Sequence, residues 1–121
     1  MGHAVGGLLD APHGAALSAV FLPAARYQCQ AAITRCLTFL HAVRPDLKID
    51  HQEESLQALL DDFQSLQKEL SLPLTLAELN VRDSDLSALA RHALEDVCLA
   101  TAPHAPTLED LEELFVEAYG R

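Results

Sequence analysis

Residues 51–70 read HQEESLQALLDDFQSLQKEL and carry the clearest structural signal in the chain. Leucines and one phenylalanine recur at intervals of three and four residues, and acidic side chains fill many of the positions between them. This periodicity predicts an amphipathic helix with one buried and one solvated face. The predicted buried stripe consists of Leu56, Leu59, Leu60, Phe63, Leu66 and Leu70.

The segments before this helix are also predicted to be helical. Residues 13–27 are apolar on nearly every side, which is typical of a helix buried all round. Pro23 is expected to kink or end that helix. Residues 28–43 show a second amphipathic pattern, which stops at Arg44 because the residue before a proline avoids the helical region.

After the central helix, cap signals mark the helix starts. Thr75 and Glu78 have the spacing of a capping box, which predicts a short turn of helix. Asp83 is expected to cap a helix over residues 84–98. Thr107 and Asp110 predict the start of the last helix.

The composition supports a helical fold of one domain over residues 1–121. The chain has 23 Leu and 19 Ala against 13 β-branched residues, and Ala and Leu are strong helix formers. A length of 121 residues suits a single domain. We therefore predict an all-α bundle of about five helices with antiparallel neighbours.

The charge is acidic and unevenly distributed. The net charge is −10, with no local cluster of Lys and Arg, so nucleic acid is not expected as a partner. Residues 1–45 hold one acid and three arginines, a net of +2, and the remaining residues hold 17 acids and 5 bases, a net of −12. The first third is thus almost uncharged and apolar.

The lack of a recognisable targeting signal and the spacing of the cysteines predict an intracellular protein. No apolar stretch is long enough to span a membrane, and no basic region precedes an apolar run as in a secretory signal. We therefore expect no membrane partner and a cytoplasmic location. Cys29 and Cys36 would lie about 10 Å apart along a continuous helix, too far for a disulfide, so both are expected in the core.

Two histidines stand out near the start of the chain. His3 and Pro12-His13-Gly14 flank a segment of small and apolar residues, and an apolar helix then reaches Leu22-Pro23. The separation of ten residues matches neither one helical face nor a standard zinc pattern. Taken alone, each histidine is more readily explained as a structural residue.

The order of these residues resembles the iron-containing (group III) alcohol dehydrogenases. The likeness continues in residues 72–81 and in residues 96–107, which begin Asp96-Val97-Cys98. It covers about the last third of such an enzyme, and residues 28–60 do not contribute to it. The resemblance implies the C-terminal part of an all-helical metal-binding domain, without the N-terminal domain that binds NAD(P).

The resemblance also implies roles for three residues. His13 matches the last of the four ligands, one Asp and three His, that hold Fe²⁺ or another divalent metal in the family. His3 matches a histidine near the nicotinamide that is implicated in proton relay, and Cys98 matches a position that lines the cleft in some members. For Cys98, a small buried apolar residue is the alternative. Ala102 and His104 depart from the family's Asn and Arg.

The implied reaction is the NAD(P)-dependent oxidation of a small alcohol or the reverse reduction of an aldehyde, with Fe²⁺ or Zn²⁺ as the Lewis acid. Only one of four metal ligands is present, so we expect the chain alone to be inactive and to bind neither cofactor stably. The apolar residues 1–27 predict a partner, either a second copy or a complementary nucleotide-binding half. The alternative function is a non-catalytic helical interaction or dimerisation module.

Overall fold

The structure is a computed structural model that describes residues 1–46 and 52–121. Its described residues form helices and no strands, so the predicted all-α class is confirmed. The α-helices are α1 (Gly2–Leu9), α2 (His13–Ala31), α3 (Ile33–Val43), α4 (Gln52–Glu69), α5 (Leu86–Leu94) and α6 (Leu108–Tyr119). They are six rather than about five because the first apolar segment is also helical, and three 3₁₀ turns, Ala77–Leu79, Asp83–Asp85 and Val97–Thr101, join the later ones.

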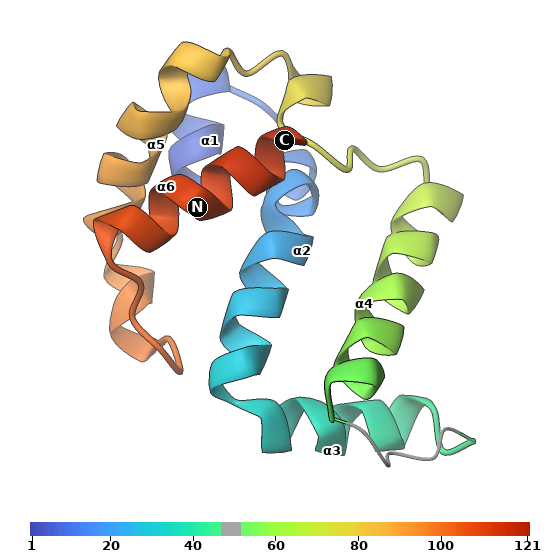
Figure 1. Cartoon of the computed structure of the whole chain (residues 1–121). Coiled ribbons are helices and arrows are strands. Elements are labelled where there is room, and N and C mark those ends of the chain that lie inside the picture. Colours follow the sequence, from blue (N-terminus) through green and yellow to red (C-terminus); the bar gives the residue numbers. More distant parts are fainter. Residues whose placement is uncertain (47–51) are drawn as a thin grey trace.

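The helices form a packed end and an extended arm. In Figure 1, α1, α5 and α6 gather around the first half of α2, whereas α3 turns away from its far end and α4 returns beside it. The packed end contains one continuous core of buried residues. These are Ala4, Val5, Ala16, Ala19, Val20, Leu76, Val81, Leu86, Leu89, Ala90, Ala93, Leu111, Phe115 and Ala118.

Helix α2 differs from its prediction in two ways. It continues through Pro23 to Ala31, and Pro23 is buried within it. It is also not buried on all sides, because Leu17 and Phe21 are 46% and 38% exposed. The apolar residues of the first third therefore divide between the core of this chain and an uncovered face.

The predicted helix over residues 28–43 is broken at Ala32. The backbone of Ala32 leaves the helical region (φ −127°, ψ 39°), although neither Gly nor Pro marks the site. The break lets α3 turn, so that Leu40 is fully buried and α3 packs against α4. Tertiary packing, which a periodicity argument cannot include, decides this boundary.

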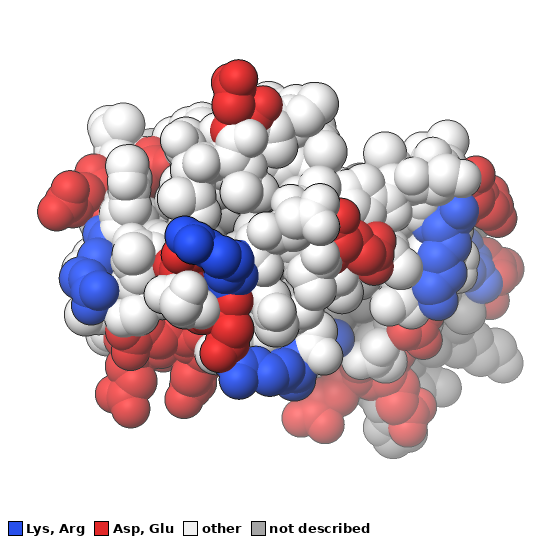
Figure 2. All heavy atoms as spheres, turned by 90° about the horizontal axis from the view of Figure 1, so that it is seen from above, with Lys and Arg blue, Asp and Glu red and all other residues white. Residues whose placement is uncertain are grey.

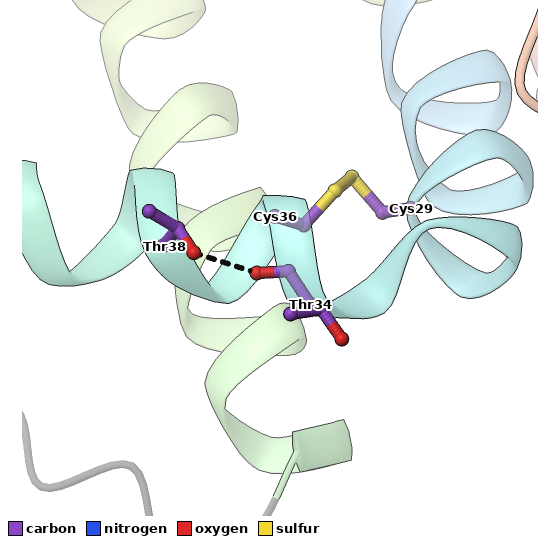
Figure 3. The surroundings of a disulfide bond; sticks show 4 residues. All are labelled: Cys29, Thr34, Cys36 and Thr38. Atoms are coloured by element: carbon purple, nitrogen blue, oxygen red, sulfur yellow. Dashed lines mark hydrogen bonds between the residues drawn. A yellow bond between two sulfur atoms is a disulfide. The ribbon is translucent and has the colours of Figure 1, made fainter.

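The same break corrects the interpretation of the cysteines. The Cα atoms of Cys29 and Cys36 lie 5.7 Å apart and the two residues form a disulfide, shown in Figure 3. The expected separation of about 10 Å assumed one straight helix, and the bend brings the two turns together. Both side chains are half-buried rather than core, and the bond ties α2 to α3.

Helix α4 confirms the central prediction in its first half. Leu56, Leu59 and Leu60 are buried, but Leu66 and Leu70 at the other end are 50% and 60% exposed. His51, at the start of the predicted helix, lies outside the described residues. The stripe is therefore only partly covered.

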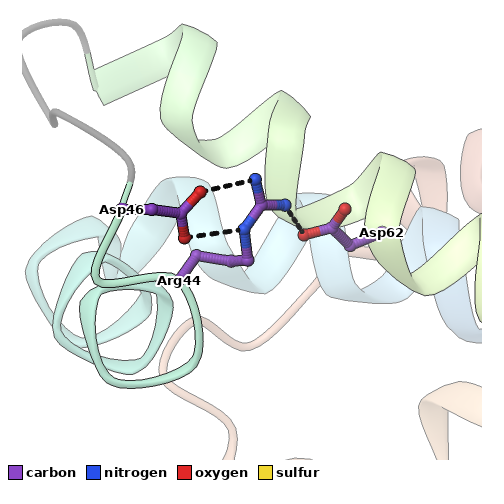
Figure 4. Close-up of polar contacts among 3 residues, drawn as sticks. All are labelled: Arg44, Asp46 and Asp62. Carbon is purple, nitrogen blue, oxygen red and sulfur yellow. Dashed lines mark hydrogen bonds and ion pairs between the residues drawn. The ribbon is translucent and has the colours of Figure 1, made fainter.

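Polar and aromatic contacts fix α4 beside α2 and α3. The guanidinium of Arg44 donates to Asp46 at 3.1 Å and to Asp62 on α4 at 2.7 Å, as Figure 4 shows. The Phe63 ring on α4 lies 5.1 Å from that of Phe21 and 6.2 Å from that of Phe39. These contacts connect the arm to the packed end through side chains of three helices.

Two of the three predicted caps are confirmed. The side chain of Thr107 accepts from the backbone of Asp110 and forms a reciprocal capping box. Glu78 likewise donates its backbone N–H to Thr75 Oγ1 at 3.3 Å. The prediction for Asp83 is wrong, because that carboxylate pairs with Arg121 instead, and α5 begins at Leu86 and ends at Leu94.

Candidate functional site

The two predicted histidines meet at the corner between α1 and α2. Asp10 ends α1 in the left-handed region (φ 51°), and Pro12 precedes the first turn of α2. This tight connection stacks the rings of His3 and His13, whose centroids lie 5.5 Å apart with an interplanar angle of 22°. The two helices lie close together here, because a Cβ on Gly2 would lie 2.5 Å from Leu17 Cδ2 and 3.8 Å from Leu17 Cα.

A carboxylate from the other end of the chain completes this corner. Asp96 Oδ2 lies 2.8 Å from Nδ1 of His3, across 93 residues of sequence. Asp96 Oδ1 accepts the backbone N–H of Cys98 at 2.9 Å and so caps the 3₁₀ turn that follows α5. The Asp96 side chain is only 12% exposed, against 58% for His3. One carboxylate therefore holds His3 and the Cys98 turn in place together.

The hydrogen bonds to Asp96 set its ionisation. The backbone N–H of Cys98, followed by the His3 side chain, lowers the pKa of the Asp96 carboxyl to about 2. Asp96 in turn raises the pKa of the Cys98 thiol. Because an ionised carboxylate only accepts hydrogen bonds, Nδ1 of His3 carries the proton in this pair.

We expect the pKa of Asp96 to be measurable directly. In ¹³C NMR of the carboxyl carbons, Asp96 should titrate near pH 2, well below the ordinary value of 3.8. Because the folded-state pKa is lowered, its stabilising contribution is complete above about pH 5 and is lost as the pH falls towards 2. The variant His3→Ala should raise the pKa only in part, since the Cys98 N–H remains. His92→Ala, an exposed residue of α5, is the control. A midpoint at the ordinary value would contradict this assignment.

The structure brings all three predicted site residues to one corner. His3 and Cys98 both contact Asp96, and His13 stacks on His3. Cys98 is a free and exposed cysteine, so the alternative of a buried apolar residue is wrong. The partner that sequence reasoning missed is Asp96. Its signal was present in the Asp96-Val97-Cys98 segment, but its hydrogen bond to His3 depends on how α1 packs against α5.

The donors around His13 do not complete a metal site in this chain. Within the described residues, the group of metal-binding side chains at this corner is His3, Asp96 and Cys98, and His13 is not in it. A single imidazole in competition with water does not fix a divalent ion, since such sites use three or four protein ligands. The metal that the resemblance implies at His13 therefore requires ligands from outside the described residues.

The remaining histidines with described positions lie at the surface, as expected. His41, His92 and His104 are exposed. The backbone N–H and C=O of His104 pair with the side chain of Gln28, and its ring lies 5.5 Å from the Tyr27 ring. These contacts close the loop before α6 against α2 and have no connection with the corner.

The charged surface is predominantly acidic. Figure 2 shows more acidic than basic side chains on the face that it presents. Among the described residues, four arginines lie in ion pairs: Arg26 with Glu117, Arg44 with Asp46 and Asp62, Arg82 with Asp85, and Arg121 with Asp83. Of the described helices, none is both long and apolar enough to cross a membrane.

The fold and the corner together define an all-helical domain that presents imidazole donors at one end. A model of the "Fe-containing alcohol dehydrogenase family, C-terminal" matches residues 1–119. The chain therefore belongs to the iron-containing alcohol dehydrogenase family, as its resemblance to that family predicted.

Two similar proteins, a reductase and a dehydrogenase, support this placement. Lactaldehyde reductase of Escherichia coli (strain K12) is 31% identical over 120 residues, which cover 98% of this chain and 31% of the relative. Alcohol dehydrogenase 4 of Saccharomyces cerevisiae (strain ATCC 204508 / S288c) is 32% identical over 122 residues, which cover 98% of this chain and 30% of the relative. The chain thus spans about a third of the length of these relatives.

A solved structure shows the same fold. The crystal structure of a 1,3-propanediol oxidoreductase aligns with a TM-score of 0.87 and 23% sequence identity. The alignment covers 97% of this chain and 31% of that chain. The helical architecture described above therefore has the same fold as about a third of that longer chain.

Proposed function

We propose that this chain serves as the C-terminal helical portion of an NAD(P)-dependent alcohol dehydrogenase, which interconverts small alcohols and aldehydes. The observation that carries the proposal is the family match over residues 1–119. The relatives named above, a lactaldehyde reductase and an alcohol dehydrogenase, support this class of reaction. In this proposal, His3 lies beside the nicotinamide and exchanges a proton at Nε2, while Asp96 keeps its ring in one orientation. Cys98 would line the part of the assembled active site that receives the nicotinamide.

We further propose that the partner is a complementary nucleotide-binding half. An apolar cleft of about 320 Å³ opens beside α2, where Leu17 and Phe21 are exposed. Other side chains along it are Tyr27, Leu99, Pro106 and Leu114. Apolar surface of this kind is favourable to cover, at about 25 cal/mol per Å². The missing ligands of His13 would come from the same partner.

A non-catalytic interaction or dimerisation module is the second candidate. The observation that favours it is that His13 does not belong to the group of described side chains whose ligand atoms lie close enough together to hold an ion. In that case, the apolar face around the cleft beside α2 would pack against the same face of a second copy, since two-fold dimers bury the same face on both chains. Light scattering distinguishes the two. A stable dimer that Phe21→Asp dissociates, but Leu70→Asp on the far end of α4 does not, favours the module.

The proposed compartment is the cytoplasm. A reducing compartment rarely preserves a disulfide such as Cys29–Cys36. We therefore propose that the pair is present there as two thiols and closes on exposure to oxidant.

The activity test compares the chain alone with a fusion. The purified chain should show no alcohol-dependent reduction of NAD⁺ or NADP⁺ with added Fe²⁺ or Zn²⁺, because most ligands and the nucleotide site are absent. When it replaces the corresponding third of E. coli lactaldehyde reductase, the fusion should reduce NAD(P)⁺ with a small alcohol.

The His13→Ala variant of the fusion is the decisive control. Its activity should be lower than that of the unmodified fusion by at least roughly 10–100-fold, which is the cost of removing a supporting residue at a metal site. His92→Ala should retain activity. A fusion that is folded by circular dichroism but inactive would refute the proposal. Turnover by the chain alone above its own His13→Ala variant would show that the incomplete site is sufficient.

A further inference from the structure

Three side chains of different chemistry converge at the corner, and His13 is not one of them. An imidazole nitrogen of His3, a carboxylate oxygen of Asp96 and the sulfur of Cys98 all lie within 4.8 Å of one another. His3 comes from α1, whereas Asp96 and Cys98 come from the turn after α5, so the fold itself assembles the group. The three residues are an imidazole, a carboxylate and a free thiol, which are the usual ligands of Zn²⁺.

The ligand atoms are close to, but not yet at, the separations of a closed site. Bonds from Zn²⁺ to nitrogen, oxygen and sulfur are about 2.0–2.3 Å, so two ligands of one tetrahedral ion lie roughly 3.3–3.8 Å apart. Small side-chain rotations therefore suffice to close the group around an ion. The His3 side chain is 58% exposed, and the Cys98 side chain is exposed too.

Asp96 is already held in position for this role. Its Oδ1 accepts the backbone N–H of Cys98, which leaves Oδ2 directed at His3. A bound ion would take the place of the proton between Oδ2 and Nδ1 of His3. The negative charges of Asp96 and of a Cys98 thiolate would neutralise a dication, and water would fill the fourth position.

We propose that His3, Asp96 and Cys98 bind a divalent cation of the zinc class, at a site distinct from the position of His13. The thiol makes Mg²⁺ and Ca²⁺ unsuitable, because they prefer oxygen ligands, and selects thiophilic ions. This site needs no residue from outside the chain and does not rest on the proposed dehydrogenase function. Because a thiol binds such an ion as the thiolate, binding releases a proton.

Cobalt absorption tests the site directly. The metal-free chain, purified without reductant so that Cys29 and Cys36 stay paired, is titrated with Co²⁺. We expect a near-ultraviolet thiolate-to-Co²⁺ charge-transfer band and visible bands of tetrahedral Co²⁺, both abolished by Zn²⁺. Cys98→Ser should remove the charge-transfer band, and His3→Ala and Asp96→Asn should each weaken binding roughly 10–100-fold.

Two control variants distinguish this site from cobalt binding elsewhere on the chain. His13→Ala and His92→Ala should leave the cobalt bands unchanged, and circular dichroism should show that every variant is folded. The proposal is overturned if no charge-transfer band appears at saturating Co²⁺, or if the band survives Cys98→Ser. It is also overturned if His3→Ala and Asp96→Asn bind as the unmodified chain does, or if His13→Ala abolishes the bands. A failed dehydrogenase fusion has no bearing on these outcomes.

Discussion

Replacing Phe115 with alanine is expected to reduce the free energy of unfolding by about 3–5 kcal/mol. Phe115 is the largest fully buried side chain and has no exposed surface. It belongs to the cluster that joins α1, α2, α5 and α6, so its removal opens a cavity at the centre of the packed end. Domains of this size are stable by roughly 5–15 kcal/mol, and the loss is therefore a large fraction of the total.

Urea denaturation followed by far-ultraviolet circular dichroism measures this effect. Leu70→Ala is the control, because Leu70 is also a large apolar residue, but it lies just after α4 and is 60% exposed. Its expected change stays within about 0.5 kcal/mol, as for most surface substitutions. Equal losses for the two variants would mean that the packed end is not the main source of stability.

The geometry of the corner depends on the same core. His3 lies on α1 between Gly2 and Ala4, both buried, and Asp96 lies three residues after Ala93, which is 1% exposed. The 2.8 Å contact between His3 and Asp96 therefore exists only while α1 packs against α5. In Phe115→Ala we expect the low pKa of Asp96 to rise together with the loss of stability.

Local patterns in the sequence were sufficient for the helices themselves. The leucine spacing of α4 and the Thr107–Asp110 capping box are contained in single segments, and the structure confirms both. The three separated segments at residues 3–14, 72–81 and 96–107 together indicated the family, which the match over residues 1–119 confirms. The period of apolar residues and the spacing of cap residues describe interactions between residues that are close in sequence.

The features that escaped prediction depend on contacts between distant segments. The break at Ala32 has no Gly or Pro to announce it, and it follows from the burial of Leu40 by α4. The Asp96–His3 hydrogen bond spans 93 residues and could be found only once α1 and α5 were placed together. The disulfide was excluded on a distance that holds for a straight helix alone.

Opening the Cys29–Cys36 disulfide is expected to lower the free energy of unfolding by about 2.5 kcal/mol. The bond closes a short loop, with a sequence separation of seven, and the chain-entropy model gives about 3 kcal/mol for a loop of 15 residues. The loss should be local, because the bond joins α2 to α3 in the arm and lies outside the core cluster of the packed end. Hydrogen exchange should therefore increase in α3 and remain low in α5 and α6.

The double variant Cys29→Ser, Cys36→Ser and the reduced chain should show the same decrease in urea denaturation. Cys98→Ser is the matched control, because Cys98 is free and its replacement leaves the disulfide intact. Reductant should then still destabilise Cys98→Ser but have no effect on the double variant. A chain whose stability is indifferent to reductant would show that packing of Leu40 against α4, rather than the covalent bond, holds the bend at Ala32.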